Sequence, residues 1–308
     1  MSAATAVRVG AFLPGEISHY GPADLRAALA RIERAGLDHV GMADHVSFHA
    51  GWGQDGLVEA AMLAMVTDLP IYVGVYLLAL RHPVPVARQL AQIAQRAPGR
   101  LTLGIGVGGE DRHEVEVCGV DPRTRGRRTD ECIQVLRGVA GGETFSFEGE
   151  FFSLDRVRII PAPTERIPLI VGGRDPRALR RAGRLGDGWL GVWSTPEKFA
   201  ERLAVVEAEA TAAGRANVAW QHGLQPWAGF GPTREAARTA VGDAMEQMYR
   251  IPFERFERFT PYGSPDEVAD SLRPYVALGC RHFNVSAQGS RWEEGVEGLG
   301  EVRRLLNS

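Results

Sequence analysis

Strand-like and helix-like segments alternate along all 308 residues, and this alternation predicts an α/β protein of the (β/α)8 barrel class, the TIM barrel. Eight apolar segments have strand character, and helical patterns separate them. Barrels of this class commonly reach this length as one domain. Because no shift in composition marks a boundary, we expect a single domain over residues 1–308.

The predicted strands are short and mostly apolar, as strands covered on both faces of a parallel sheet are. The third, IYVGVYLL, is apolar almost throughout. The fourth alternates Leu101, Leu103 and Ile105 with small or polar residues before it reaches Gly108-Gly109. The strands are predicted over residues 7–13, 39–43, 71–78, 101–107, 168–171, 188–192, 218–224 and 282–287.

Proline, glycine and capping residues set the predicted helix boundaries. Pro22 suits the first position of a helix that Gly36 ends. Thr195-Pro196 combines an N-cap with a first-turn proline, and Ser264 with Glu267 forms a capping box. Other helices are predicted over residues 57–67, 84–96, 114–119, 127–138 and 233–249, from residue 175, and at the C-terminus.

Insertions at strand ends interrupt the repeat. Residues 143–154 alternate around Glu148-Gly149, which predicts a small β-hairpin after the fourth helix. Residues 229–262 form a second insertion. Residues 47–56, which follow the second strand, are rich in glycine and aromatic residues and are predicted to form a long loop.

Composition excludes several classes of function. The net charge of −3 favours neither a nucleic-acid surface nor a polybasic membrane anchor. Three scattered cysteines, and the lack of a targeting or membrane-spanning segment, predict a cytoplasmic protein. The single lysine, Lys198, falls in a predicted first helical turn, which disfavours Schiff-base aldolase chemistry. No metal site is predicted, because no His-x-His pattern or carboxylate cluster occurs.

The candidate site residues follow the strands, because the carboxyl ends of barrel strands meet at one rim. Glycine, aromatic groups and a few acids and imidazoles at this rim suit a flat conjugated ring with a phosphate tail. The set comprises Glu16, Asp44, His45, Gly74, Val75, Gly106, Gly108, Gly109, Glu110, Gly172, Gly173, Arg174, Trp193, Ser194, His222 and Gln225.

Two parts of this set have a defined chemical prediction. Gly172-Gly173-Arg174 before a helix start offers backbone N–H groups and a guanidinium for a phosphate, with a plain turn as the alternative. His45 can exchange a proton near neutral pH, whereas the alternative for Asp44 is a structural cap.

Several segments together resemble the bacterial luciferase-like family, which comprises flavin- or deazaflavin-dependent TIM-barrel oxidoreductases. They are GLDHVGMADHV, VGVYLLALRHPVPVARQLAQIAQRAPGRLTLGIGVGGE, FEGEFF and IPLIVGGRDPRALRRAGRLGDGW, from about Gly10 to Trp193. The resemblance implies a two-electron ring carrier at the barrel mouth, a homodimer, and a bulge, often with a non-prolyl cis peptide, at Gly74-Val75. Ring-binding roles are implied for Gly74, Val75, Gly106, Gly108 and Gly109.

One branch of that family uses coenzyme F-420, and Asp44-His45, Gly109-Glu110 and Glu16 match its pattern. Members that oxidise sugar phosphates carry a tryptophan a few residues after Asp-His. Here Phe48-His49 stands at that place, with Trp52 later, and this departure argues against a sugar-phosphate substrate.

The resulting prediction is an F-420-dependent hydride transfer in which His45 handles the proton and Asp44, Glu110 and Glu16 are further catalytic groups. Gly172, Gly173, Arg174 and Ser194 are predicted to hold the cofactor's phosphate. The alternatives are an FMN-dependent monooxygenase and a flavin-binding protein without turnover. Aromatic residues predict a small apolar or conjugated substrate: Phe48, Trp52, Trp227 and Phe230.

Overall fold

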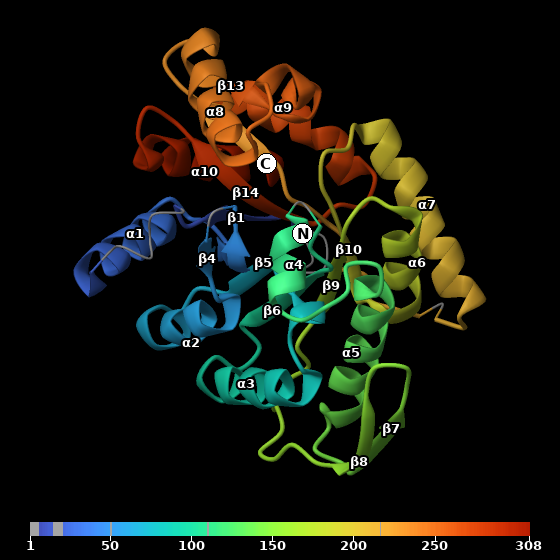
Figure 1. The fold of residues 1–308 in the computed structure, drawn as a ribbon. Coiled ribbons are helices and arrows are strands. Elements are labelled where there is room, and N and C mark those ends of the chain that lie inside the picture. Colours follow the sequence, from blue (N-terminus) through green and yellow to red (C-terminus); the bar gives the residue numbers. More distant parts are fainter. Residues whose placement is uncertain (1–5, 15–20, 50, 110, 216) are drawn as a thin grey trace. The chain divides into compact units, whose positions relative to one another are not determined.

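The computed structural model describes residues 6–14, 21–49, 51–109, 111–215 and 217–308. In the main sheet the strand order is β1-β2-β5-β6-β9-β10-β11-β14-β12-β13, and β1 also pairs with β14. Eight parallel strands therefore form a closed ring with helices between them (Figure 1), which confirms the predicted (β/α)8 fold class. The strands are β1 (Arg8–Phe12), β2 (His39–Met42), β5 (Ile71–Leu77), β6 (Leu101–Gly106), β9 (Leu169–Gly172), β10 (Gly188–Gly191), β11 (Gly223–Leu224), β12 (Trp227–Phe230), β13 (Tyr262–Gly263) and β14 (His282–Gln288).

The helices begin close to the predicted positions. Pro22 and Pro196 each occupy the first position of a helix, and Ser264 with Glu267 forms the predicted capping box. The α-helices are α1 (Pro22–Arg34), α2 (Gly56–Val66), α3 (Pro83–Arg96), α4 (Arg112–Val117), α5 (Arg125–Val139), α6 (Pro176–Leu185), α7 (Pro196–Ala212), α8 (Arg234–Tyr249), α9 (Pro265–Ala277) and α10 (Trp292–Leu306). Short 3₁₀ turns are η2 (Leu78–Leu80), η3 (Phe253–Arg255) and η4 (Glu257–Phe259). No helix of the described ranges is long and apolar enough to cross a membrane.

Two compact units make up the chain. The first unit contains the segments up to Gly41, Trp189–Val205 and Ala219–Ser308. In it β14 pairs with β1, β11 and β12, and Phe283 and Val285 of β14 are fully buried. The second unit contains Met42–Gly188 and Val206–Val218, with the parallel strands β5, β6 and β9 at its core.

The predicted small hairpin is present as β7 (Phe145–Glu148) and β8 (Ser153–Val157), which lies beside α5 in Figure 1. Glu131 of α5 holds its turn by accepting hydrogen bonds from the backbone N–H groups of residues 150, 151 and 152. The second predicted insertion carries α8, η3, η4 and β13 in the first unit.

Two predictions of local structure are wrong. The predicted loop over residues 47–56 contains an antiparallel hairpin, β3 (His45–Phe48) and β4 (Trp52–Gln54). The seventh strand was expected over residues 218–224, but β11 begins at Gly223 and continues as β12 after a break at Gln225-Pro226. The Gln225 N–H still donates to the Gly191 carbonyl of β10 at 2.9 Å, but Pro226 has no N–H to donate, and the strand is interrupted there.

Candidate active site

The third strand of the barrel, β5, carries a bulge at its centre. The register against β6 shifts between Val73 and Tyr76, and the peptide bond between Gly74 and Val75 is cis, as the resemblance implied. Every residue of β5 is buried except Val75, which is partly exposed. The bulge therefore presents the Val75 side chain to an accessible space at the strand.

Glycines on the neighbouring strands make room for Val75. A Cβ atom built on Gly172 would lie 3.0 Å from Val75 Cγ1, and one on Gly104 would lie 3.2 Å from the same atom. A Cβ on Gly106 would overlap Val75 Cγ2. Gly104, Gly106 and Gly172 thus form a cradle for the valine, a contact that could not be predicted from sequence.

The other predicted ring- and phosphate-binding glycines have conformations that favour glycine. Gly108, Gly109 and Gly173 have φ values of 69°, 136° and 113°. A Cβ on Gly109 would lie 2.8 Å from Nη2 of Arg125, so the backbone there passes close to the guanidinium at the start of α5. Arg174 is exposed, directly before the N-cap of α6.

Asp44 is buried and does not face solvent. Its carboxylate accepts hydrogen bonds from the backbone N–H groups of Gly56 at 2.9 Å and Leu77 at 2.8 Å, and from Arg81 at 2.6 and 2.8 Å. Burial raises the pKa of the Asp44 carboxyl, but all four contacts are from donors, so only the ionised form accepts every one of them. Asp44 therefore ties the end of β2 to the end of β5 and to the start of α2.

Arg81 connects this carboxylate to two other groups. Its Nη2 lies 3.2 Å from Asp55, the N-cap residue of α2, and its guanidinium lies 4.4 Å from the ring centre of Tyr76. Burial lowers the pKa of Arg81, but the charge and hydrogen bonds of Asp44 outweigh burial and raise it. The pair is therefore ionised, and it fixes the backbone directly before His45.

His45 lies directly after Asp44 and forms a pair with Glu114 of α4. Its Nδ1 lies 3.1 and 3.2 Å from the two carboxylate oxygens. The imidazole ring is flanked by Phe48, with ring centres 4.2 Å apart, and by Trp52, at 5.6 Å. In the described part of the chain Nε2 of His45 has no hydrogen-bond partner, and the side chain is 14% exposed.

Glu114 is buried, and it also holds the backbone of β3. Its Oε1 accepts hydrogen bonds from the N–H groups of Val46 at 2.7 Å and Ser47 at 3.2 Å. Burial raises the pKa of Glu114, but the hydrogen bond and charge interaction with His45 and these two N–H donors lower it below its ordinary value. The carboxylate is therefore ionised at neutral pH.

A second carboxylate of α4 anchors the tip of the same hairpin. Asp111, the N-cap of α4, accepts a hydrogen bond from the backbone N–H of His49 at 2.9 Å, and its Oδ2 lies 3.8 Å from Nδ1 of His49. The β3–β4 hairpin is thus fastened to α4 at two places, through Glu114 and through Asp111.

The remaining predicted site residues either fall outside the described residues or belong to the first unit. Glu16 and Glu110 fall outside the described residues. Ser194, in the first unit, is buried; its hydroxyl accepts a hydrogen bond from Arg202, and its carbonyl accepts one from the Tyr275 hydroxyl at 2.5 Å. His222 is buried too, and its Nδ1 accepts a hydrogen bond from the Trp189 N–H at 3.2 Å. The Asn284 amide donates to Gln225 at 3.2 Å.

Two of the aromatic residues predicted to face substrate belong to the core instead. Phe48 is 2% exposed and Phe230 is 3% exposed. Trp52 and Trp227 are partly exposed, and Trp227 Nε1 donates to the Tyr249 hydroxyl at 3.2 Å. The four were predicted from residue type alone, which does not reveal the side of a strand on which a ring lies.

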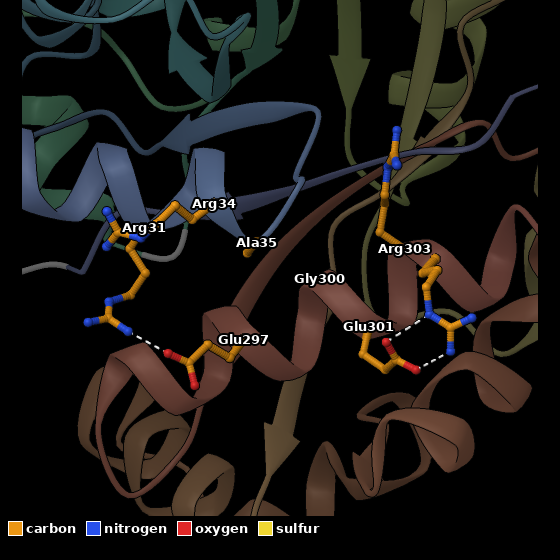
Figure 2. A pocket seen from close by; sticks show the side chains of 8 residues that line it. Arg31, Arg34, Ala35, Glu297, Gly300, Glu301 and Arg303 are labelled. Atoms are coloured by element: carbon orange, nitrogen blue, oxygen red, sulfur yellow. Dashed lines mark hydrogen bonds and ion pairs between the residues drawn. The ribbon is translucent and has the colours of Figure 1, made fainter.

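The first unit contains a charged cavity of about 560 Å³ between α1 and α10. Figure 2 shows that Arg31 and Glu297 form an ion pair across it, at 2.5 Å. None of the predicted site residues lines this cavity. Among the described residues no group of three or more histidine, cysteine, aspartate or glutamate side chains could hold a metal ion.

Comparison with known proteins gives a consistent family. Residues 7–251 match the family model described as luciferase-like monooxygenase. An uncharacterised protein of Mycobacterium tuberculosis is 36% identical over 159 residues, which cover 52% of this chain and 54% of that protein. This chain thus matches about half the length of that relative.

Two longer matches have assigned activities. The F-420-dependent glucose-6-phosphate dehydrogenase of Nakamurella multipartita is 26% identical over 314 residues, covering 92% of this chain and 91% of that enzyme. The solved structure of an F-420-dependent secondary alcohol dehydrogenase with an F-420–acetone adduct has a TM-score of 0.86 at 20% identity, covering 98% of this chain and 100% of that one. The second likeness establishes the fold. The chain belongs to the luciferase-like monooxygenase family and has its (β/α)8 barrel.

Proposed function

We propose that the protein is an F-420-dependent oxidoreductase that transfers a hydride between the deazaflavin and a small organic substrate. The observation that carries the proposal is the His45–Glu114 pair at the end of β2, next to the strand that presents Val75. The family and the two F-420-dependent proteins named above support the same cofactor.

The second unit fits a flat ring cofactor by its own geometry. Val75 is partly exposed in a strand that is otherwise buried, and the neighbouring positions that face it, Gly104, Gly106 and Gly172, carry no side chain. We propose that Gly74 and Val75 lie against one face of the ring. Gly106, Gly108 and Gly109 let the adjoining backbone approach the ring. Gly172, Gly173 and Arg174 bind the phosphate of the cofactor.

When bound, the deazaflavin supplies or accepts the hydride at its C5. His45 takes or returns the accompanying proton at Nε2, the nitrogen that Glu114 leaves open. Asp44 acts as a positioning residue, because its carboxylate is enclosed by donors of the protein. Glu110 and Glu16 remain predicted catalytic groups, and Ser194 a predicted phosphate contact.

The family description favours one rival, an FMN-dependent monooxygenase that inserts an oxygen atom from O2. The deazaflavin lacks the N5 on which that oxygen chemistry depends, so the two activities separate by cofactor. A protein that binds a flavin without turnover is the third possibility, and it requires no proton-handling imidazole.

Binding and turnover together test the proposal. Purified protein is titrated with F-420 and with FMN, following absorbance and fluorescence. The reduced and oxidised loaded forms are then mixed with a panel of small alcohols, ketones and conjugated carbonyl compounds. We expect tighter binding of F-420, and a change in its absorbance that depends on substrate. Preferred binding of FMN with O2 consumption would reject the proposal in favour of the monooxygenase, and binding without any substrate-dependent change would favour the third possibility.

We further propose a cytoplasmic homodimer that acts on an apolar or conjugated substrate. The exposed residues of α2 are Val58, Ala61, Met62, Met65 and Val66, and the partly exposed Glu59 borders them. Met65 is 69% exposed and Val58 55% exposed. An apolar stripe of this kind marks an interaction surface, and it can pair with its own copy about a two-fold axis.

A further inference from the structure

The contacts of Glu114 reach beyond the hairpin that it anchors. Its carboxylate is buried and ionised, and within the described residues His45 is the only basic side chain at ion-pair distance. An ionised carboxylate has no proton to donate. Nδ1 of His45 therefore carries the hydrogen of their contact, in both the neutral and the protonated imidazole.

We propose that Glu114 is a positioning residue that fixes His45 in the Nδ1–H tautomer and so leaves Nε2 as the nitrogen that exchanges a proton with substrate. The imidazole is neutral before it takes a proton, and its Nε2 then holds a lone pair. After uptake of the proton, the carboxylate compensates the positive charge. This assignment rests on the proposed function for the proton step, but the tautomer itself does not depend on it.

The division of work between the two carboxylate oxygens makes the role testable. Oε1 accepts the N–H groups of Val46 and Ser47 and also lies 3.2 Å from Nδ1 of His45, whereas Oε2 has Nδ1 as its one partner among the described residues, at 3.1 Å. In Glu114→Gln the amide oxygen can occupy the Oε1 position and keep both backbone hydrogen bonds. The amide NH2 group then faces Nδ1, and because it is a donor it favours the opposite tautomer, with the hydrogen on Nε2.

Asp111 provides the matched control. It anchors the same hairpin through the His49 N–H, but it does not touch His45. Asp111→Asn therefore weakens the attachment of the hairpin and leaves the imidazole contact in place. If Glu114 served only to hold the hairpin, the two variants would have similar effects.

The first measurement is the ¹⁵N and ¹H NMR spectrum of the histidine rings in the protein without cofactor, with His45 identified by its absence in His45→Ala. We expect an Nδ1–H tautomer for His45 in the parent protein and in Asp111→Asn, and a shift towards Nε2–H in Glu114→Gln. An Nε2–H tautomer in the parent protein would overturn the inference, even if the variants failed to fold. An unchanged tautomer in a folded Glu114→Gln would also overturn it.

The second measurement is turnover with the deazaflavin. We expect kcat of Glu114→Gln to fall about 10²- to 10⁴-fold, the usual range for a general acid–base group, with the Kd of F-420 changed less than twofold. Asp111→Asn should change kcat less than fivefold. If the tautomer inverts as expected but kcat does not change, the proton role of His45 in the proposed function fails, and the tautomer assignment stands.

Discussion

Arg81 donates two hydrogen bonds to the buried carboxylate of Asp44, at 2.6 and 2.8 Å, and thereby joins the ends of two neighbouring barrel strands. The Asp44 side chain has no exposed surface, and that of Arg81 is 18% exposed. A charge left without its partner at such a depth is costly, so this pair matters more for stability than the ion pairs at the surface.

Arg81→Met should lower the free energy of unfolding by about 3–5 kcal/mol, the range for removing one partner of a buried pair. Urea unfolding measures the change. Arg123→Met is the control, because Arg123 pairs with Asp121 at the surface and is 84% exposed. A loss below ~1 kcal/mol for Arg81→Met would show that water or another group replaces the guanidinium.

Gly106→Ala should destabilise the protein by about 1–3 kcal/mol, because the new methyl group would overlap Val75. Val75→Ala removes the overlapping atoms, so the double variant should lose less than the sum of the two single losses. A Cβ at Gly141 meets no atom within 4 Å, and Gly141→Ala is therefore the control. Additive losses in the cycle would contradict the cradle that the glycines form around Val75.

His45→Ala should lower kcat with F-420 by about 10²- to 10⁴-fold and leave the Kd of the cofactor nearly unchanged. The reason is that Nε2 of His45 is open for a proton, whereas the ring is assigned to Val75 and the glycines. His113→Ala on α4, with an exposed side chain, serves as the control. An equal loss of binding and turnover would reject the proton-handling role.

Acid should destabilise the protein through three histidines of the first unit, of which His39 and His222 are buried and His282 is partly buried. Burial lowers the pKa of His39 and of His222 to about 4, and that of His282 to about 3. In the unfolded chain these groups bind protons below their ordinary pKa near 6.5, whereas the folded chain resists protonation. Stability is therefore complete above about pH 6.5 and is lost as the pH falls towards 4, by up to about 1.4 kcal/mol per pKa unit for each group.

Urea unfolding between pH 7.5 and 4.5 measures this slope. His222→Gln should reduce the slope of the unfolding free energy against pH by the contribution of one histidine. His113→Gln at the surface should leave the slope unchanged. An unchanged slope in His222→Gln would mean that this imidazole binds protons equally in the folded and the unfolded chain.

Met65→Glu should convert the proposed dimer to a monomer, because it places a charge in the middle of the apolar face of α2. Sedimentation velocity measures the association state. Val205→Glu introduces the same charge at an exposed apolar position of α7 and should not change association. A monomeric parent protein would remove the homodimer from the proposal.

The order of elements could be predicted because each follows from local chemistry. Each signal consists of residues that are close together in the sequence. A strand is marked by one short apolar run, and a helix start by a pair such as Ser264 and Glu267, three residues apart. The β3–β4 hairpin could not be predicted in this way. Its backbone donors at Val46 and Ser47 are satisfied by Glu114, 68 and 67 residues further along the chain.

The candidate site divides along the same line. Asp44 and His45 can be predicted as site residues because they follow a strand. Their different functions cannot be predicted from sequence, because each depends on a partner far along the chain. Asp44 pairs with Arg81, 37 residues away, and His45 pairs with Glu114, 69 residues away. The glycines near the strand ends stand out in the sequence. Their contact with Val75 cannot be predicted, because it is set by the register of β5 against β6. Residue type near a strand end indicates the chemistry available, and only the partners reveal which group is free to use it.

The attachment of the hairpin to α4 has a consequence for engineering. Glu114 fastens the hairpin at its base and Asp111 fastens it near its tip, so the two tasks reside in different side chains. New side chains at Gly51 would thus vary the turn while leaving the imidazole under the control of Glu114. The attachment of the tip and the orientation of the imidazole become separately adjustable in this scaffold.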